Sequence, residues 1–322
     1  MNLEYALALF SSCSYTCQSY CVAIVVLAIY YGINLLAGRI NYGHAKVVAL
    51  YIYPVKSCKG IKVDSCKISA RGFENDRIFM VVNSSLRFVT QRTHPKLATV
   101  STNIDGDHLI LSAPSMPDMK VALAEPSSVD TINVTVWSDD CQGFEPNHEA
   151  SEWFSTYLNV PNLKLVRMSD SFVRPTHRSF SHSGQTGFAD MFPFLLTSVK
   201  SIDALNSRMP IYNKASSVNF RPNIVVDGVE EFAEDKWREV VAGGVRMTVA
   251  KLCSRCKMPN VDPDTGVMDE NFQVTQVLNS FRTGKDLSLR KSWNEAVFFG
   301  VQMDNHNIEG GSVCVGDILR VK

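Results

Sequence analysis

One uncharged apolar segment near the N-terminus constrains this chain more than any other feature. Residues 19–37 read SYCVAIVVLAIYYGINLLA and contain no charged side chain. At about 1.5 Å per residue, a helix of this length spans roughly 28 Å, close to the hydrocarbon thickness of a bilayer. A soluble core helix would normally show a polar face. We therefore predict a tail (1–18), a transmembrane anchor (19–37) and a short linker (38–46).

The charges that flank this segment predict its orientation. Arg39 and Lys46 follow it, so the positive-inside tendency places the large C-terminal part in the cytosol. A cleaved signal peptide should begin with basic residues, but the preceding flank carries only Glu4. An unusually apolar core helix is the other alternative. The nine cysteines are odd in number and lack a regular framework, which favours a reduced compartment over secretion.

Length and charge bound the classes of function that remain. A chain of 322 residues exceeds the usual size of one domain, so two globular units are expected besides the anchor. Lys and Arg together number 32 and so do Asp and Glu. This balance removes the strongly basic footprint of a nucleic-acid-binding protein. Any anion that the protein binds must therefore be held by a local group of cations.

The remaining residues are mainly β with some α. Strand-like runs and turn residues divide the chain into a β-rich domain over residues 47–168 and a second domain over residues 169–322. Residues 169–188 form an irregular loop between them, rich in Ser, Arg, His and Gly. Helices are expected at 149–158 and, with Ser198 as N-cap, at 198–208. Strands are expected at 46–53, 65–68, 77–83, 97–102, 108–111, 132–137, 223–226, 245–252, 296–303 and 312–321, the last of which contains a turn at 315–317.

The stretch that carries the most chemical information is residues 251–268, KLCSRCKMPNVDPDTGVM. Cys253 and Cys256 stand at metal-ligand spacing just beyond an expected strand. Structural zinc would need a second ligand pair, and no other C-x-x-C or compact His pair occurs. A thioredoxin-like redox pair would need a βαβ setting, whereas these surroundings look β-rich. Two buried cysteines acting as small hydrophobic residues remain the simplest alternative.

Several motifs in the same order resemble one known family. Residues 253–256 read CSRC and are followed by VDPDTGVM, residues 53–60 read YPVKSCKG, Asp76-Arg77 precedes a strand, and residues 219–224 read NFRPNI. LNSR at 205–208 and AEDKW at 233–237 extend the match. The chain from residue 47 to its end resembles the mitochondrial amidoxime-reducing component family, a group of MOSC-domain proteins. The resemblance implies a β-rich MOSC N-terminal domain and a MOSC β-barrel domain, with a cofactor in the cleft between them.

The resemblance also implies a set of site residues. The family cofactor is the molybdenum cofactor (molybdopterin), and the cysteine that binds its metal falls on Cys256. Arg255 and Lys257 would favour the Cys256 thiolate if they point inward. Asp190 matches an acid near the metal that relays protons or orients substrate. The other cofactor-binding positions are Lys56, Ser57, Arg77 and Arg221 for the phosphate, and Asn219 and Asn223 for the pterin edges. The sequence departs from the family at Met191 and Phe192, where small hydroxyl residues are expected.

The function implied by the resemblance is reduction of N-hydroxylated compounds such as amidoximes and hydroxylamines. In this family, electrons come from NADH through cytochrome b5 reductase and cytochrome b5, and the proteins lie in the mitochondrial outer membrane. The chain shows no convincing G-x-G-x-x-G dinucleotide site, consistent with external electron donors. Two alternatives stay open: a MOSC sulfur carrier, and a module that binds the molybdenum cofactor without reductase activity.

Overall fold

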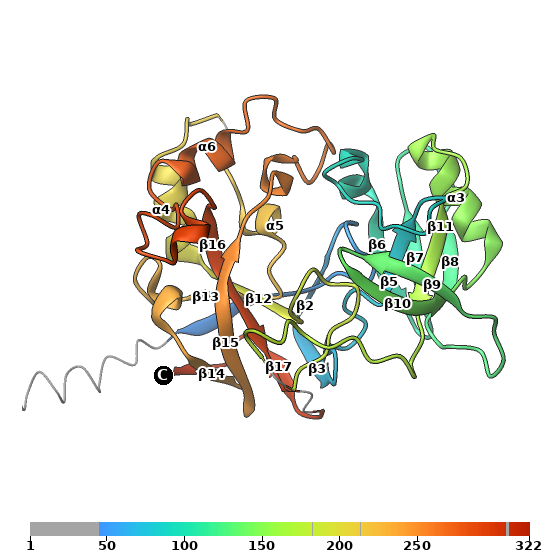
Figure 1. Ribbon diagram of the computed structural model, residues 1–322, viewed down its shortest axis with the longest axis horizontal. Coiled ribbons are helices and arrows are strands. Elements are labelled where there is room, and N and C mark those ends of the chain that lie inside the picture. Colours follow the sequence, from blue (N-terminus) through green and yellow to red (C-terminus); the bar gives the residue numbers. More distant parts are fainter. Residues whose placement is uncertain (1–44, 182, 213, 307–308) are drawn as a thin grey trace, which may run out of the picture. The chain divides into compact units, whose positions relative to one another are not determined.

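The computed structural model describes residues 45–322, except residues 182, 213, 307 and 308 (Figure 1). The predicted tail, anchor and most of the linker lie outside the described residues. Among the residues that are described, no helix is long and apolar enough to cross a membrane. The described part is mainly β with few helices, as the sequence predicted.

The largest sheet has eight strands in the order β18-β14-β15-β16-β12-β13-β1-β2 (Figure 1). β1 comes from the start of the described chain and pairs antiparallel with β13, so the first residues of the predicted N-terminal domain join a sheet built mostly from C-terminal residues. The strands are β1 (Lys46–Ile52), β2 (Ile61–Val63), β12 (Phe194–Ser198), β13 (Ile224–Asp227), β14 (Glu239–Ala242), β15 (Val245–Ser254), β16 (Phe298–Asp304) and β18 (Arg320–Val321).

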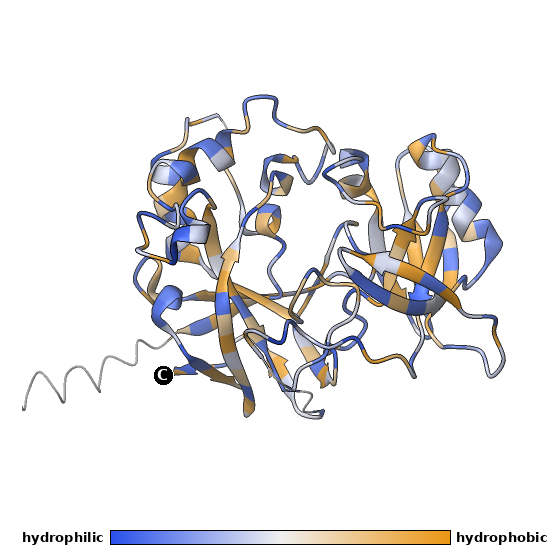
Figure 2. Ribbon diagram, viewed as in Figure 1, coloured by the Kyte–Doolittle hydropathy of each residue, from blue (hydrophilic) through white to orange (hydrophobic). Residues whose placement is uncertain are grey.

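Backbone hydrogen bonds bring the two ends of this sheet together. Gly316 N donates to Val47 O, Val47 N donates to Asp317 O, and Leu319 N donates to Ala45 O. The segment leading into β18 therefore runs beside the N-terminal half of β1, and the sheet curls into a barrel-like layer. Apolar side chains from β1, β12, β13, β14, β15 and β16 fill its interior, and Figure 2 shows the matching orange stretches along these strands.

A second group of strands packs with one helix into its own core. One sheet has the order β5-β11-β10-β9 and another the order β6-β7-β8. Helix α3 (His148–Leu158) covers them with Trp153, Phe154 and Tyr157, all buried. The strands are β5 (Phe79–Val82), β6 (Ser101–Asp105), β7 (His108–Ser112), β8 (Met119–Ala122), β9 (Ile132–Val136), β10 (Asp139–Phe144) and β11 (Lys164–Met168).

The remaining elements are short. A small sheet joins β17 (Ser312–Cys314), β3 (Ser65–Ser69) and β4 (Gly72–Phe73). Ser198 caps helix α4 (Val199–Ser207) by accepting a hydrogen bond from Ser201 N, which confirms the predicted N-cap. The other short helices are α5 (Ser217–Phe220), α6 (Gln273–Asn279), η1 (Pro95–Thr99), η2 (Ala233–Lys236), η3 (Met258–Asn260) and η4 (Lys291–Trp293).

Two strand predictions need correction. The strand expected at residues 97–102 is instead the 3-10 helix η1 followed by β6, because Pro95 fixes a helical φ at its start and Leu97 and Ala98 turn into the core. The strand expected from residue 77 begins only at Phe79, because Arg77 has φ 50° and cannot continue a strand. The irregular loop predicted at 169–188 is confirmed, since no helix or strand is assigned there among the described residues.

Packing beneath the site gives a first testable expectation. Phe299 is fully buried and stacks on Phe220 with ring centroids 4.1 Å apart. We expect Phe299→Ala to lower the free energy of unfolding by about 3–5 kcal/mol, because it leaves a cavity under the segment that carries Arg221. Ile211→Ala, at a side chain 90% exposed, should cost less than about 0.5 kcal/mol. Denaturant unfolding measures both, and equal losses would contradict this account of the core.

Candidate active site

A cavity of about 960 Å³ lies where loops from both groups of strands meet. This volume is near the upper end of the range for small-molecule sites, so it can hold a sizeable ligand and a small substrate. Its walls come from the turn after β1, the residue pair before β5, the β9–β10 hairpin, the β11–β12 loop, the α5–β13 junction and the end of β15. Seven of the eight sequence-predicted site residues line it: Lys56, Ser57, Arg77, Asp190, Arg221, Asn223 and Cys256.

The lining carries a strong excess of positive charge in a chain that is neutral as a whole. The acidic lining residues are Asp139, Asp140 and Asp190, and the basic ones are Lys56, Arg77, Arg92, Arg174, Arg178, Arg221 and Arg255. Low-dielectric walls strengthen the field of such a group. The cavity is therefore suited to an anionic ligand.

A buried tyrosine organises two of these cations. The guanidinium carbons of Arg77 and Arg221 lie 4.2 and 4.3 Å from the centroid of the Tyr53 ring. Such contacts are favourable when the groups are withdrawn from water. Burial raises the pKa of the Tyr53 hydroxyl well above its usual range, and that hydroxyl donates to Pro222 O at 3.2 Å. Tyr53 therefore stays neutral and acts as a platform for both guanidinium groups.

Arg221 has an unused donor. Its Nη1 donates to Cys58 O at 2.7 Å, but its buried Nη2 has no hydrogen-bond partner among the described residues. Its φ is 59°, a left-handed backbone conformation that is uncommon outside glycine, at the end of α5. Burial lowers the pKa of Arg221 to about 10, so the group remains charged at neutral pH. A buried guanidinium with a free donor is the local feature that an anion would satisfy.

Two of the predicted asparagines are committed to the protein itself. The Asn223 Oδ1 accepts from Arg77 Nη1 at 2.9 Å, and its Nδ2 donates to Tyr51 O at 3.2 Å. Asn219 does not line the main cavity. Its Nδ2 donates to Pro259 O and Val261 O, and it lines a smaller neighbouring cavity. In the structure both side chains brace the loops around the site.

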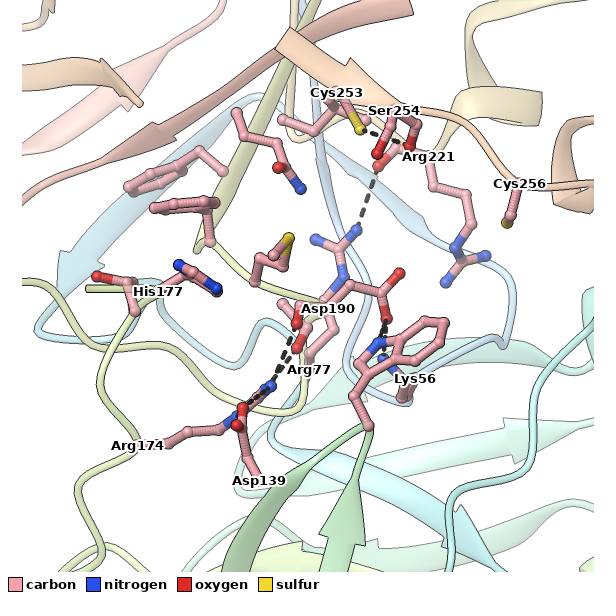
Figure 3. Close-up of a pocket in the computed structure, with 18 of the residues that line it drawn as sticks. Lys56, Arg77, Asp139, Arg174, His177, Asp190, Arg221, Cys253, Ser254 and Cys256 are labelled. Carbon is pink, nitrogen blue, oxygen red and sulfur yellow. Dashed lines mark hydrogen bonds and ion pairs between the residues drawn. The ribbon is translucent and has the colours of Figure 1, made fainter. Parts of the chain in front are cut away.

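The two cysteines of the C-x-x-C motif have different surroundings (Figure 3). Cys253, in β15, is buried, and its Sγ accepts from Arg255 Nη1 at 3.0 Å. Cys256 lies two residues beyond β15, is exposed in the cavity wall and makes no hydrogen bond to any described residue. Arg255 therefore points toward Cys253 rather than Cys256. Lys257 is exposed and forms no ion pair with any residue that the structure describes.

The structure bears on the alternatives for this motif. In the described part of the chain, no group of three or more His, Cys, Asp or Glu side chains is arranged to hold a metal ion. The residues after Cys256 form the 3-10 helix η3 and a turn in which Asp262 Oδ1 accepts from Asp264 N and Thr265 N. β15 is followed by η3 rather than directly by an α-helix, unlike the strand-to-helix turn that carries a thioredoxin-like pair.

Asp190 faces the cavity and is held by two donors. Lys56 Nζ lies 2.6 Å from its Oδ1, and Trp137 Nε1 donates to the same oxygen at 3.1 Å. Burial raises the pKa of Asp190, but the Lys56 charge and these hydrogen bonds outweigh it and hold the pKa well below its usual range. Burial lowers the pKa of Lys56, and the pairing with Asp190 opposes that shift. Asp190 is therefore ionised at neutral pH.

The positions that depart from the family pattern form an apolar wall. Met191 and Phe192 both line the cavity, and Phe192 is buried with its ring set edge-on to Phe180. These side chains offer no hydroxyl to a ligand. Beside this wall, Arg174 is fully buried and pairs with Asp139 at 2.7 Å, which ties the β11–β12 loop to the β9–β10 hairpin.

Sequence reasoning missed several lining residues. Arg174 falls within the irregular loop predicted at 169–188, but no motif distinguished it from the other Arg residues of that loop. Trp137 and Arg92 gave no usable signal, because a lone Trp at a strand end and a lone Arg in a loop are more often ordinary surface residues. Tyr53 belongs to the YPVKSCKG motif, of which only Lys56 and Ser57 were predicted to bind the cofactor.

Comparison with known proteins defines the class of this fold and site. Residues 44–161 match the MOSC N-terminal beta barrel domain, and residues 183–320 match the MOSC domain. The chain is 34% identical over 280 residues to mitochondrial amidoxime-reducing component 1 of Homo sapiens, covering 84% of this chain and 81% of that protein. It is 34% identical to human component 2 and 35% identical to component 2 of Bos taurus, over 84% of this chain in each case and 82% and 81% of those proteins. The chain therefore belongs to the mitochondrial amidoxime-reducing component family of MOSC-domain proteins.

The contrast between the cysteines is directly testable. At pH 8 we expect iodoacetamide to modify Cys256 at least about tenfold faster than Cys58, because Cys256 is exposed whereas Cys58 is fully buried. Burial also raises the pKa of Cys58 to about 12, which leaves about one thiolate in ten thousand at that pH. Peptide mass mapping over time measures the two rates in the folded protein without cofactor. Comparable rates would mean that Cys256 is not open to the cavity.

Proposed function

We propose that this protein is a molybdenum-cofactor-dependent reductase of N-hydroxylated compounds. The observation that carries the proposal is the cavity itself, which combines an exposed, uncommitted Cys256 thiol with a buried group of cations. The free Nη2 of Arg221 and the excess of Lys and Arg in the lining fit a cofactor that bears a phosphate. The thiol fits a soft, sulfur-ligated metal. The residues present thus agree with the cofactor that the family implies.

We assign the holding of this cofactor to two groups of residues. Cys256 would ligate the metal, while Lys56, Ser57, Arg77 and Arg221 would hold the phosphate. Asn219 and Asn223, first predicted to contact the pterin, are instead proposed to keep these residues in place, because their amides are used within the protein. When bound, the cofactor would supply the two-electron redox chemistry. The protein's own residues would bind, orient and desolvate the substrate.

The overall reaction consumes two electrons and two protons. The N–O bond of the amidoxime or hydroxylamine breaks, the amidine or amine forms, and the oxygen leaves as water. Asp190 is ionised, so it suits the role of hydrogen-bond acceptor for the substrate's O–H or N–H better than that of a proton donor. We propose that it orients the substrate, with the apolar wall of Met191 and Phe192 covering the organic part.

External donors complete the proposed cycle. We propose that electrons come from cytochrome b5 and its NADH-dependent reductase. Residues 19–37 would anchor the protein in a membrane, with the C-terminal domains in the cytosol and the mitochondrial outer membrane as the proposed location. Anchoring on the surface that carries the donors would raise their effective concentration.

Metal content is the first test of this proposal. The full chain should hold about one molybdenum and one pterin per chain when expressed in a host that makes the cofactor. Cys256→Ala should lose the metal or its thiolate signature, because it removes the proposed ligand. Elemental analysis and pterin fluorescence measure both. Cys314→Ala, a half-buried cysteine that does not line the cavity, is the matched control and should retain the metal.

The outcomes separate the candidate functions. Metal with turnover of benzamidoxime supports the reductase. Metal without turnover under any reductant would favour a cofactor-binding module, and cyanide-labile sulfur on Cys256 would favour a sulfur carrier. Absence of both metal and pterin in the wild-type protein would overturn the proposal.

Substitution of Asp190 tests the substrate-orienting role. We expect Asp190→Asn to lower kcat for an amidoxime by about 10²-fold, because the charged acceptor is lost while the cavity keeps its shape. Asp203→Asn changes an exposed carboxylate on α4 that does not line the cavity, and it should leave kcat unchanged. Steady-state kinetics at saturating substrate give both values. A kcat within twofold of the wild type for Asp190→Asn would remove Asp190 from the site.

A further inference from the structure

Trp137 occupies an unusual place for a large aromatic residue. It lies at the tip of the hairpin between β9 and β10, its side chain is 43% exposed, and it lines the main cavity. Trp137 and Ser138 form the two-residue loop, since Asp139 pairs with Val136 across the hairpin. Burial of apolar surface therefore does not by itself explain a tryptophan at this position.

The backbone at Trp137 is also unfavourable. Its φ is 57°, and tight two-residue hairpin turns usually give such a position to Gly, Asn or Asp. A bulky side chain at positive φ is a true outlier and persists only where surrounding contacts hold it. The side chain must therefore gain contacts that offset this local cost, and those contacts lie on the cavity side.

Two neighbours fix the plane of the indole. The Arg92 guanidinium stacks over the ring at 4.2 Å from its centroid, and the Phe88 ring lies 5.3 Å away at a 50° tilt. With the ring held in this way, its Nε1 donates to Asp190 Oδ1 at 3.1 Å. The hydrogen bond links the β9–β10 hairpin to the β11–β12 loop, 53 residues further along the chain.

The Trp137 hydrogen bond falls on the same carboxylate oxygen of Asp190 as the Lys56 ion pair. Lys56 and Trp137 both donate to Oδ1 of Asp190, whereas Oδ2 accepts no hydrogen bond from a described residue. Two donors on one oxygen fix the rotation of the carboxylate and leave the other oxygen available. We propose that Trp137 is a positioning residue that, together with Lys56, presents Asp190 Oδ2 to a substrate in the cavity. This inference rests on the proposed function, in which Asp190 orients the substrate.

The surroundings of Asp190 show what loss of the indole N–H would change. Lys56 supplies the charge partner, Arg92 adds a more distant positive charge, and Arg174 contacts the backbone carbonyl of Asp190. Removing the indole N–H leaves these charges in place, so Asp190 stays ionised. A single donor on Oδ1 then permits the carboxylate to rotate, and the orientation of Oδ2 is lost.

A double-mutant cycle between Trp137→Phe and Asp190→Asn tests the inference on the loaded full chain. Trp137→Phe keeps an aromatic ring and removes the indole N–H, and we expect kcat to fall about tenfold with little change in KM. In the Asp190→Asn background the same change should lower kcat less than twofold, because the group through which Trp137 acts is already gone. Multiplicative effects of the two substitutions on kcat would overturn the proposal.

Trp153→Phe is the matched control. Trp153 is buried, lies on α3 away from the cavity, and its indole N–H donates to Pro117 O at 2.7 Å. Trp153→Phe should lower Tm and leave kcat unchanged. Trp137→Phe should instead lower kcat and leave Tm unchanged. A second variant, Trp137→Gly, relieves the positive φ but also loses the contacts with Arg92 and Phe88, so its Tm should stay near that of the wild type. Its kcat should fall as that of Trp137→Phe does.

A readout on cofactor-free protein separates this inference from the proposed function. Asp190→Asn should shift the intrinsic tryptophan emission, and the shift should be absent when Trp137 is already Phe. If the shift is absent in both backgrounds, the contact does not form in solution and the inference fails. If the shift is present but the wild-type protein reduces no N-hydroxylated compound, the proposed function fails while the contact stands.

Discussion

The site depends on holding the guanidinium groups of both Arg77 and Arg221 against the ring of Tyr53. Two guanidinium groups repel each other and lose hydration when buried, so their neighbours must offset both costs. The Tyr53 ring contacts both, and Asp76 pairs with Arg77 at 2.5 Å. Arg77 Nη2 donates to Arg221 O and Arg221 Nη1 donates to Cys58 O, whereas the buried Arg221 Nη2 has no partner among the described residues. Positive charge is thus left incompletely satisfied at one point, where an anionic ligand would complete it.

This arrangement explains why strands from the two ends of the chain share one sheet. Tyr53 follows β1, Asp76 and Arg77 precede β5, and Arg221 precedes β13. Asn223 links these segments, because its side chain bonds Arg77 and the backbones of β1 and β12, while Asp76 Oδ1 accepts from Tyr53 N at 2.7 Å. Pairing of β1 with β13 brings the cations together. The barrel and the site are therefore built by the same contacts.

Sequence reasoning found the parts that depend on local pattern. The N-cap at Ser198, the helix over α3 and most strands follow periodicity and turn chemistry, and the motif residues Lys56, Arg77, Arg221 and Cys256 meet at one cavity. It missed η1, because a buried 3-10 turn and a short strand give the same apolar pattern. The sequence does not predict which polar atoms of the site lack a hydrogen-bond partner. The side-chain amides of Asn219 and Asn223 are hydrogen-bonded within the protein, whereas Arg221 Nη2 is not. This difference depends on tertiary geometry, which a sequence pattern does not reveal.

The cavity has one cationic wall and one apolar wall. Lys56, Arg77 and Arg221 on the first favour an anion. Met191 and Phe192 on the second present apolar surface, which forms no directional bond. A directional hydrogen bond to a small polar ligand can come from Asp190, which lies at the boundary between these two walls. Its carboxylate is ionised because Lys56 is close, and its rotation is fixed because Trp137 shares the same oxygen. A neutral or freely rotating carboxyl at this boundary would lack either the charge or the fixed direction of such a contact, and the apolar wall could supply neither.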